Sequence, residues 1–217
     1  MEYLKGIMAQ GRVRLPVPHK KVGILGGTFN PPHTGHVDMA QHVKREFALD
    51  EVFLMPCGTP PHKTEDIACA HIRLKMTQLC TEGQAGLKVL DIETKRKGYS
   101  YTVDTMRELS GKNPETDYYF IIGADTVFEL ASWHKCRELF TLTRFVCVRR
   151  VAHDTLKLSA EIVRLKEEYG ADILLSEYTG LFMSSSYIRD RIRQGKSIEG
   201  LVPQNVEEYI IANGLYR

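Results

Sequence analysis

The chain alternates short apolar runs with amphipathic segments over most of its length. The apolar runs have the length and composition of buried strands, and most gaps between them carry apolar residues at helical spacing. Short hydrophobic strands that alternate with helices pair in parallel through right-handed crossovers. The sequence therefore predicts an α/β fold with a doubly wound, mainly parallel sheet. Its expected strands are residues 22–25, 51–56, 87–92, 118–123, 144–148 and 172–175.

The chain has the size of one domain. Its 217 residues, 43% hydrophobic and 26% charged, can bury one ordinary core. Because no internal repeat, low-complexity segment or linker divides it, we expect a single domain over residues 21–217. Residues 1–20 precede the first expected strand and are interpreted as an amino-terminal extension with little independent structure.

Charge and cysteine content narrow the possible partners and location. The formal net charge of +2 gives no electrostatic reason to bind nucleic acid or an anionic membrane, and we expect neither as a partner. The five cysteines are scattered and form no Cys-x-x-Cys pair, which is typical of reduced thiols in a cytoplasmic protein. No apolar run has the length of a signal-peptide core or a membrane span, so the sequence predicts a soluble protein that is not exported.

The segment after the first expected strand is the strongest candidate for a binding site. In doubly wound sheets, ligands bind beyond the carboxyl ends of the strands. Here residues 26–36 read Gly-Gly-Thr-Phe-Asn-Pro-Pro-His-Thr-Gly-His. Gly26 and Gly27 remove side chains where a ligand has to approach the backbone, and Thr28 adds a hydroxyl. The amide of Asn30 can cap or bridge the loop but cannot act as a general base.

Two histidines in this segment point to a bound phosphate. His33 and His36 share a face if a helix begins near Thr34, which is the expected N-cap. The amino terminus of a helix attracts anions, and two imidazoles there can donate hydrogen bonds to triphosphate oxygens and stabilise a leaving pyrophosphate. Gly35 leaves room for a flat base or ribose. A His-x-x-His pair is also found on plain surfaces and in zinc sites, but no further Cys or His cluster supplies the remaining ligands, so no metal site is predicted.

A second segment near the carboxyl end complements the first. Residues 183–189 read Met-Ser-Ser-Ser-Tyr-Ile-Arg and precede a helical apolar pattern. Serines at a helix start cap it and offer hydroxyls and amides to phosphate, and Arg189 adds a forked cation. An ordinary capped surface helix would have the same appearance. Taken together, the two segments predict a two-sided phosphate clamp.

At these residues the sequence resembles the nucleotidyltransferase superfamily. Residues 26–36 are similar to its Gly-x-Phe-(Asp/Asn)-Pro-x-His-x-Gly-His signature, and residues 183–189 to its Ile-Ser-Ser-Thr-x-Ile-Arg motif. Within the superfamily the chain resembles the bacterial nicotinate-nucleotide adenylyltransferases from about residue 21 to the end. The further segments that carry this likeness are residues 60–63, 98–105, 122–125, 133–135 and 214–217.

The resemblance implies a Rossmann-like nucleotidyltransferase fold and a specific reaction. Such enzymes transfer AMP from ATP to nicotinate mononucleotide, which gives deamido-NAD and pyrophosphate in NAD biosynthesis. The nucleotide's 5′-phosphate attacks the α-phosphorus of ATP in line, without a covalent enzyme intermediate. Positioning and charge stabilisation then supply the rate, which suits a site of amides, imidazoles and cations.

Residue chemistry and the resemblance together give a set of expected site residues. We expect the partners to be ATP and nicotinate mononucleotide, with Mg²⁺ carried by the ATP phosphates rather than by a protein-built metal site. The oligomeric state is open, a homo-oligomer included. The catalytic residues implied are His33, His36 and Arg189. The residues expected to bind ATP are Gly26, Gly27, Thr28, Phe29, Gly35, Gly123, Asp125, Ser185 and Ser186. Those expected to bind nicotinate mononucleotide are Lys63, Thr102, Trp133 and Lys135.

The acceptor residues keep alternative interpretations. Trp133 has the aromatic face to stack on a pyridine ring, as its family counterpart does, but it can equally be a core aromatic. Lys63 and Lys135 are candidate cations or solvated surface lysines. For His62 and Asp104, contact with the ligand and a structural role are both open interpretations.

Four other functions remain as alternatives. A pantetheine-phosphate adenylyltransferase shares both end motifs but is typically shorter and lacks the Pro-Pro-His-Lys and Trp-His-Lys segments. An adenylyltransferase specific for nicotinamide mononucleotide differs only in its acceptor, and a cytidylyltransferase is expected to carry an Arg-Thr-x-Gly-Ile-Ser signature. A non-catalytic nucleotide-binding protein would leave both histidines and Arg189 without a function.

Overall fold

The protein is built on one six-stranded parallel sheet. The structure, a computed structural model, describes residues 19–58, 67–149, 155–180 and 183–217. The strand order is β3-β2-β1-β4-β5-β6, and every neighbouring pair is parallel. This confirms the predicted doubly wound sheet, in the Rossmann order. The strands are β1 (Lys20–Gly27), β2 (Glu51–Pro56), β3 (Leu87–Val89), β4 (Thr116–Gly123), β5 (Arg144–Val148) and β6 (Ile173–Ser176).

All six expected strands form, but β3 ends three residues earlier than the predicted residue 92. The Leu90 amide still donates to the Leu54 carbonyl at 3.0 Å, and the chain then turns away from the sheet. Leu90 and Ile92 pack against the core as turn residues. Their apolar character therefore reflects burial under the neighbouring helices rather than strand pairing.

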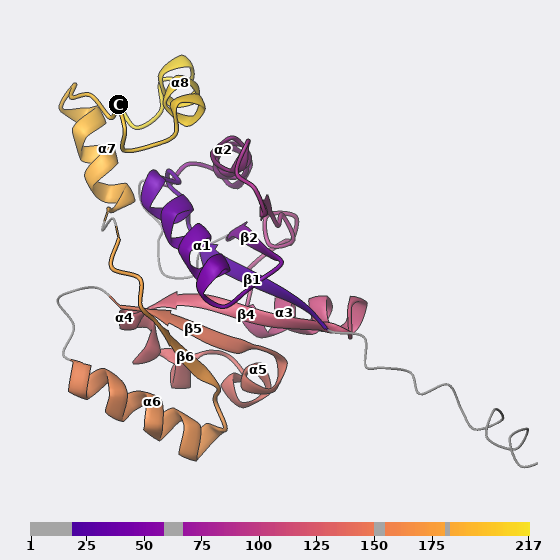
Figure 1. Ribbon diagram of the computed structural model, residues 1–217. Coiled ribbons are helices and arrows are strands. Elements are labelled where there is room, and N and C mark those ends of the chain that lie inside the picture. The colour runs from indigo at the N-terminus through magenta and orange to yellow at the C-terminus, as the bar shows by residue number, and fades with distance from the viewer. Residues whose placement is uncertain (1–18, 59–66, 150–154, 181–182) are drawn as a thin grey trace, which may run out of the picture.

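Helices cover both faces of the sheet (Figure 1). One face carries α1 and α2, and the other carries α3, α4, α5 and α6. These helices are α1 (Thr34–Glu46), α2 (Ala70–Thr81), α3 (Thr102–Lys112), α4 (Ala124–Val127), α5 (Cys136–Leu142) and α6 (Thr155–Tyr169), followed by α7 (Ser185–Arg193) and α8 (Gln204–Ala212). A single 3-10 turn, Leu130–Ser132, joins α4 to α5.

Alternate residues of the central strands supply the two cores. In β4, Phe120 and Ile122 face the core under α3, α5 and α6, whereas Tyr119 and Ile121 face the core under α1. This two-residue alternation follows from the pleat, and burial on both faces explains why β4 reads as a continuous apolar run. A third cluster joins α2, α7 and α8 through Met76, Ile188, Val206 and their neighbours.

The strand order places two loops at the switch point of the sheet. From β1 the chain builds β2 and β3 on one side and then crosses to β4 on the other, so β1 and β4 form the switch point. Leu25 pairs with Ile121, and the carboxyl ends of both strands lie side by side. Ligands bind outside this point in folds of this kind. The segments after β1 and after β4 are therefore the ones positioned to share a ligand.

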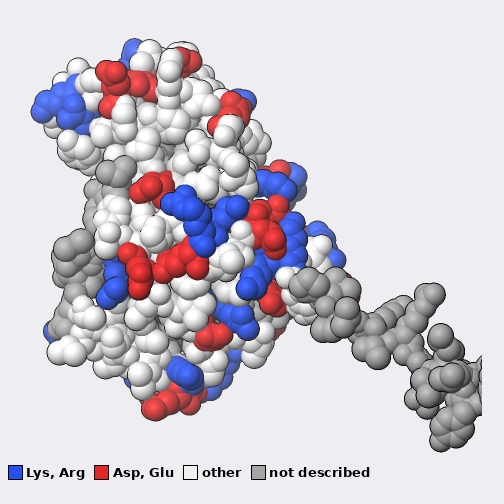
Figure 2. Space-filling view, in the orientation of Figure 1, with Lys and Arg blue, Asp and Glu red and all other residues white. Residues whose placement is uncertain are grey.

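The surface carries both charge signs in mixture. Figure 2 shows basic and acidic side chains interspersed over the face in view, without a broad region of one sign. Within the described part of the chain, no helix has the length and apolar composition that crossing a bilayer requires.

Candidate active site

The first motif forms the turn from β1 into α1. The helix begins at Thr34, as expected, but its N-cap is His33 and not Thr34. The prediction is wrong by one residue because the Thr34 amide and hydroxyl both donate to the carbonyl of Leu201, at 3.0 and 3.1 Å. A partner far away in the sequence thus takes the groups that would otherwise cap the helix.

The two histidines of the motif stack on each other. Their ring centroids are 3.5 Å apart and the planes are inclined by 18°. The backbone N–H of His33 donates to Nδ1 of His36 at 3.1 Å. The edge of Phe29 meets the His36 ring with centroids 4.8 Å apart. The structure therefore brings His33 and His36 together at the helix start, as their spacing predicts.

Both imidazoles are neutral at neutral pH in the ligand-free protein. Burial lowers the pKa of His33 to about 4. Burial and, secondarily, the charge of His33 lower the pKa of His36 well below its usual range. Because Nδ1 of His36 accepts a hydrogen bond, its proton resides on Nε2. The site thus holds hydrogen-bond donors, and a bound polyanion would raise both pKa values.

The two glycines of the motif make room for aromatic rings of the protein itself. A Cβ at Gly26 would lie 3.0 Å from Phe120, and one at Gly27 would lie 3.2 Å from the Phe29 ring. Phe29 is buried with φ of 49°, a left-handed conformation that bulky residues rarely adopt. Packing against these rings therefore favours glycine at both positions, and a role in ligand approach stays a prediction. Gly35, in the first turn of α1, is also buried.

The second motif binds directly to the first. Ser184 is the N-cap of α7, and its hydroxyl accepts a hydrogen bond from the Tyr187 amide at 3.1 Å. The Ser185 hydroxyl donates to the Pro31 carbonyl at 2.8 Å, and the Arg189 guanidinium donates to the Asn30 carbonyl at 2.9 Å. Ser186 is exposed in the first turn of α7. The two segments are thus joined at the peptide units of residues 30 and 31.

The chain between β6 and α7 is anchored along α1. Glu46 accepts hydrogen bonds from the Ser176 hydroxyl and from the Glu177 amide, at 2.5 and 2.8 Å. The Tyr178 hydroxyl donates to Asp38 at 2.8 Å. These contacts fix where the second motif starts relative to the helix that carries the histidines.

The segment after β4 lies beside the segment after β1, at the other strand of the switch point. Gly123 is the N-cap of α4, and Asp125 lies exposed in its first turn. A Cβ built at Gly123 would meet no described atom within 4 Å, so open space adjoins the backbone there. This is the geometry that a closely approaching ligand needs.

Trp133 and Thr102 lie in adjoining segments. Trp133 is half-buried and meets Phe120 edge-on, with ring centroids 6.2 Å apart. The next residue, His134, packs on Tyr101, with centroids 4.4 Å apart, and Thr102 begins α3 directly after Tyr101. Trp133 therefore combines a core contact with a partly exposed ring, so both of its expected interpretations have a physical basis.

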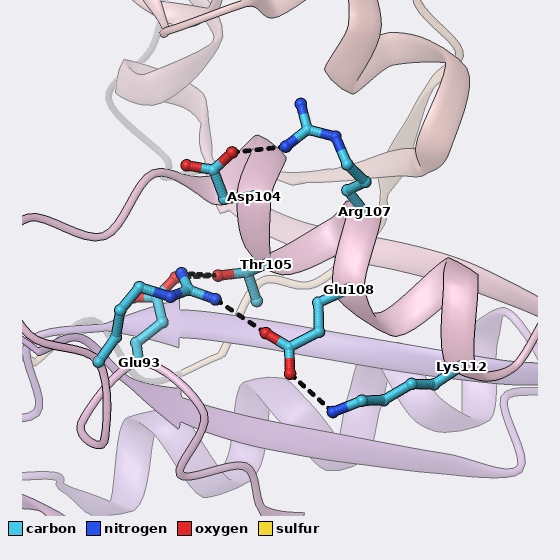
Figure 3. A network of polar contacts seen from close by, with 7 residues as sticks. Glu93, Asp104, Thr105, Arg107, Glu108 and Lys112 are labelled. Carbon is cyan, nitrogen blue, oxygen red and sulfur yellow. Dashed lines mark hydrogen bonds and ion pairs between the residues drawn. The ribbon is translucent and has the colours of Figure 1, made fainter.

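Ion pairs and hydrogen bonds hold α3 in place, and Figure 3 shows several of them, including the contact between Asp104 and Arg107. Arg107 pairs with Asp104 one turn earlier and with Glu138 of α5, both at 2.7 Å. Asp104 thus has an ionic partner on its own helix. Buried Glu93, whose pKa is raised by burial, accepts a hydrogen bond from Thr105 at 2.9 Å. The loop before α3 and the helix α5 are thereby fixed around Thr102.

Three expected positions remain less defined. Lys63 and His62 lie outside the described residues. Lys135 is exposed, with φ of 52°, and is the N-cap of α5. Among the described residues, no group of three or more His, Cys, Asp or Glu side chains could hold a metal ion.

Similarity to known proteins agrees with this geometry. The sequence model of the family described as cytidylyltransferase-like matches residues 24–191. A probable nicotinate-nucleotide adenylyltransferase of Desulfitobacterium hafniense is 37% identical over 206 residues, 94% of this chain and 100% of that protein. One from Streptococcus pneumoniae is 44% identical over 199 residues, 91% of this chain and 89% of that protein. The chain belongs to the nicotinate-nucleotide adenylyltransferase family.

A solved member of this group confirms the fold. Plasmodium falciparum nicotinic acid mononucleotide adenylyltransferase complexed with NaAD superposes with a TM-score of 0.75, over 91% of this chain and 98% of that chain. The sequences are 18% identical, so the likeness concerns the fold alone. The family resemblance and the Rossmann-like nucleotidyltransferase fold expected from the sequence are both confirmed.

Sequence reasoning missed Arg73 as part of the site's framework. Arg73 of α2 is 1% exposed and donates to the carbonyls of Thr28 and Gly58, at 2.9 and 2.6 Å. It thus joins the loops that follow β1 and β2. An arginine within an amphipathic helix gives no sign of this contact, because its acceptors are backbone carbonyls of distant segments.

Proposed function

We propose that this member of the nicotinate-nucleotide adenylyltransferase family transfers AMP from ATP to nicotinate mononucleotide. The products are deamido-NAD and pyrophosphate. The observation that carries the proposal is the union of the two motifs. Ser185 and Arg189 bind the carbonyls of residues 31 and 30, two and three positions before His33, at the switch point of the sheet.

The reaction needs no protein nucleophile. A 5′-phosphate oxygen of the acceptor bonds to the α-phosphorus of ATP, while the bond from that phosphorus to the oxygen bridging to the β-phosphorus breaks. Pyrophosphate leaves with the electron pair. His33, His36 and Arg189 act by donating hydrogen bonds to the triphosphate as negative charge moves to the leaving group. Neutral imidazoles and a guanidinium supply this stabilisation without releasing a proton.

ATP contacts are proposed on both sides of the switch point between β1 and β4. The backbone and hydroxyl groups of the first motif, the start of α7 and the start of α4 would surround the nucleotide. Mg²⁺ would bind ATP oxygens and neutralise part of their charge. The proposed ATP-binding residues are Gly26, Gly27, Thr28, Phe29, Gly35, Gly123, Asp125, Ser185 and Ser186.

The acceptor is proposed to lie between α3 and Trp133. A carboxylate only accepts hydrogen bonds, so it fits backbone donors and a nearby cation, whereas a carboxamide would also need an acceptor. At the start of α3, the amides of Thr102 and Val103 donate to no described residue, whereas those of Asp104 and Thr105 donate to the Tyr101 carbonyl. The first two N–H groups are therefore available to a ligand carboxylate. Trp133 would stack on the pyridine ring, with Lys63 or Lys135 as the cation.

Pyrophosphate release tests the assignment. With ATP and Mg²⁺, we expect release with nicotinate mononucleotide, less with nicotinamide mononucleotide and none with phosphopantetheine. CTP in place of ATP serves as the control for cytidylyl transfer. Activity only with phosphopantetheine, or only with CTP, would assign a different reaction, and no release with either pyridine nucleotide would refute the proposal.

Three further expectations stay predictions. They are the cytoplasmic location, the oligomeric state, which stays open with a homo-oligomer included, and an amino-terminal extension over residues 1–20 whose role stays open.

A further inference from the structure

The amide of Asn30 is a junction between distant parts of the chain. Asn30 is 3% exposed, and its Oδ1 accepts hydrogen bonds from the Ala68 amide at 3.0 Å and from the Tyr216 hydroxyl at 2.8 Å. Its own carbonyl accepts from Arg189. The turn that leads into the histidines is therefore held by the carboxyl-terminal Tyr216 as well as by the second motif.

The backbone conformation and the packing of Tyr216 favour this contact. Its φ of 66° lies in the left-handed region, which costs energy for a residue with a side chain and turns the chain back toward α2. Its ring packs in the cluster of α2, α7 and α8, close to the carboxyl terminus seen in Figure 1, and its hydroxyl also lies 3.9 Å from the sulfur of Met76. Burial raises the pKa of the phenol, so the hydroxyl is a donor at neutral pH.

Arg73 makes further hydrogen bonds to the same segments. Its guanidinium donates to the Ala68 carbonyl at 2.9 Å and to the Thr28 carbonyl at 2.9 Å. Ala68 thus uses its amide for Asn30 and its carbonyl for Arg73. Thr28 and Asn30, which flank Phe29, are each fixed by a residue outside the motif.

We infer that Tyr216 is a positioning residue for the phosphate-binding turn, acting through Asn30, and that the end of the chain is therefore part of the catalytic framework. The inference rests on the proposed function. Asn30 is three residues before His33, and the Tyr216 hydroxyl limits the orientations open to its amide. Without the hydroxyl, Asn30 Oδ1 loses the Tyr216 donor, and the turn can shift relative to bound ATP. Oriented catalytic groups are sensitive to displacements well below 1 Å.

The test is Tyr216→Phe, which removes one hydroxyl and keeps the ring. We expect kcat/KM for ATP at 25 °C to fall about three- to tenfold, the scale of one net hydrogen bond. The KM for nicotinate mononucleotide should stay unchanged, because Trp133 packs against the core under α3, α5 and α6, whereas Tyr216 packs with α2, α7 and α8. Tyr209→Phe is the matched control, since Tyr209 packs in the same cluster and its hydroxyl has no partner among the described residues.

A double-mutant cycle separates positioning from general packing. If Tyr216 acts through Asn30, Tyr216→Phe should have no further effect on ATP kinetics in an Asn30→Ala background. Additive effects, equal rises in the KM values of both substrates, or wild-type ATP kinetics in Tyr216→Phe would each overturn the inference. ATP affinity is also measured directly by calorimetry, which needs no acceptor. This measurement tests the inference about Tyr216 even if the proposed transfer to nicotinate mononucleotide fails.

Discussion

At the residue scale, the central feature is a pair of stacked, neutral imidazoles at the start of α1. Burial keeps both uncharged, and the His33 amide fixes the tautomer of His36. Nε2–H of His36 is then a donor whose direction is set before ligand arrives. Such preorganised donors contribute most where charge develops during the reaction.

His36→Ala should therefore lower kcat by about two to three orders of magnitude, the scale of losing one oriented transition-state donor. Steady-state pyrophosphate release measures this, and circular dichroism should show an unchanged fold. His19→Ala, at the opposite end of β1, is the control and should retain wild-type turnover. Near wild-type kcat in His36→Ala would remove the histidine from the mechanism.

The lowered pKa of His33 predicts a pH dependence of stability. An unfolded histidine titrates near 6.5, whereas folded His33 titrates at about 4. Between these values the unfolded chain binds a proton that the folded protein does not, so the free energy of unfolding falls as pH falls. The ligand-free wild type should lose about 2 to 3 kcal/mol more than His33→Asn between pH 6.5 and 4.

Urea unfolding of both proteins across this pH range provides the measurement. The comparison at pH 8, where the histidine is neutral in both states, reports the packing cost of the substitution alone. Parallel pH profiles for the two proteins would show that His33 is not held neutral by the fold.

At the element scale, the sequence predicts the strands well and the framework of the site poorly. Strand positions follow from local apolar runs, and the spacing of the two histidines follows from one helical turn. The N-cap of α1 could not be predicted, because Leu201 determines it from a distant turn. Arg73 and Tyr216 were missed as parts of the site for the same reason: their partners are groups of the backbone and of Asn30 that only the fold brings near.

The junction of α3 with Trp133 makes a prediction about substrate selectivity. Trp133→Ala should raise the KM for nicotinate mononucleotide, because the stacking face is lost, while the KM for ATP changes little. Trp133→Phe keeps an aromatic face and should recover most of the affinity. Initial rates with each substrate varied in turn give both constants. Equal effects on the two substrates would indicate that the tryptophan is structural.

At the scale of the whole molecule, the two motifs belong to different packing units. The first lies between the sheet and α1, and the second lies on α7, which packs with α2 and α8. Direct contacts at residues 30 and 31 already join them, and a triphosphate held by His33, His36 and Arg189 would join them further. Ligand binding is therefore expected to stabilise the molecule as one unit, not only the loop it touches.

ATP at one hundred times its dissociation constant should stabilise the folded protein by about 2.7 kcal/mol. For a chain of this length, this corresponds to a rise in Tm of about 5 to 10 °C. Arg189→Gln removes a charged donor, which should weaken ATP binding about 10- to 100-fold and at least halve the shift at the same ATP concentration. Arg193→Gln, on the same helix but paired with Asp190, is the control and should keep the full shift. Differential scanning calorimetry with and without ATP gives all three values, and an undiminished shift in Arg189→Gln would mean that α7 takes no part in holding the triphosphate.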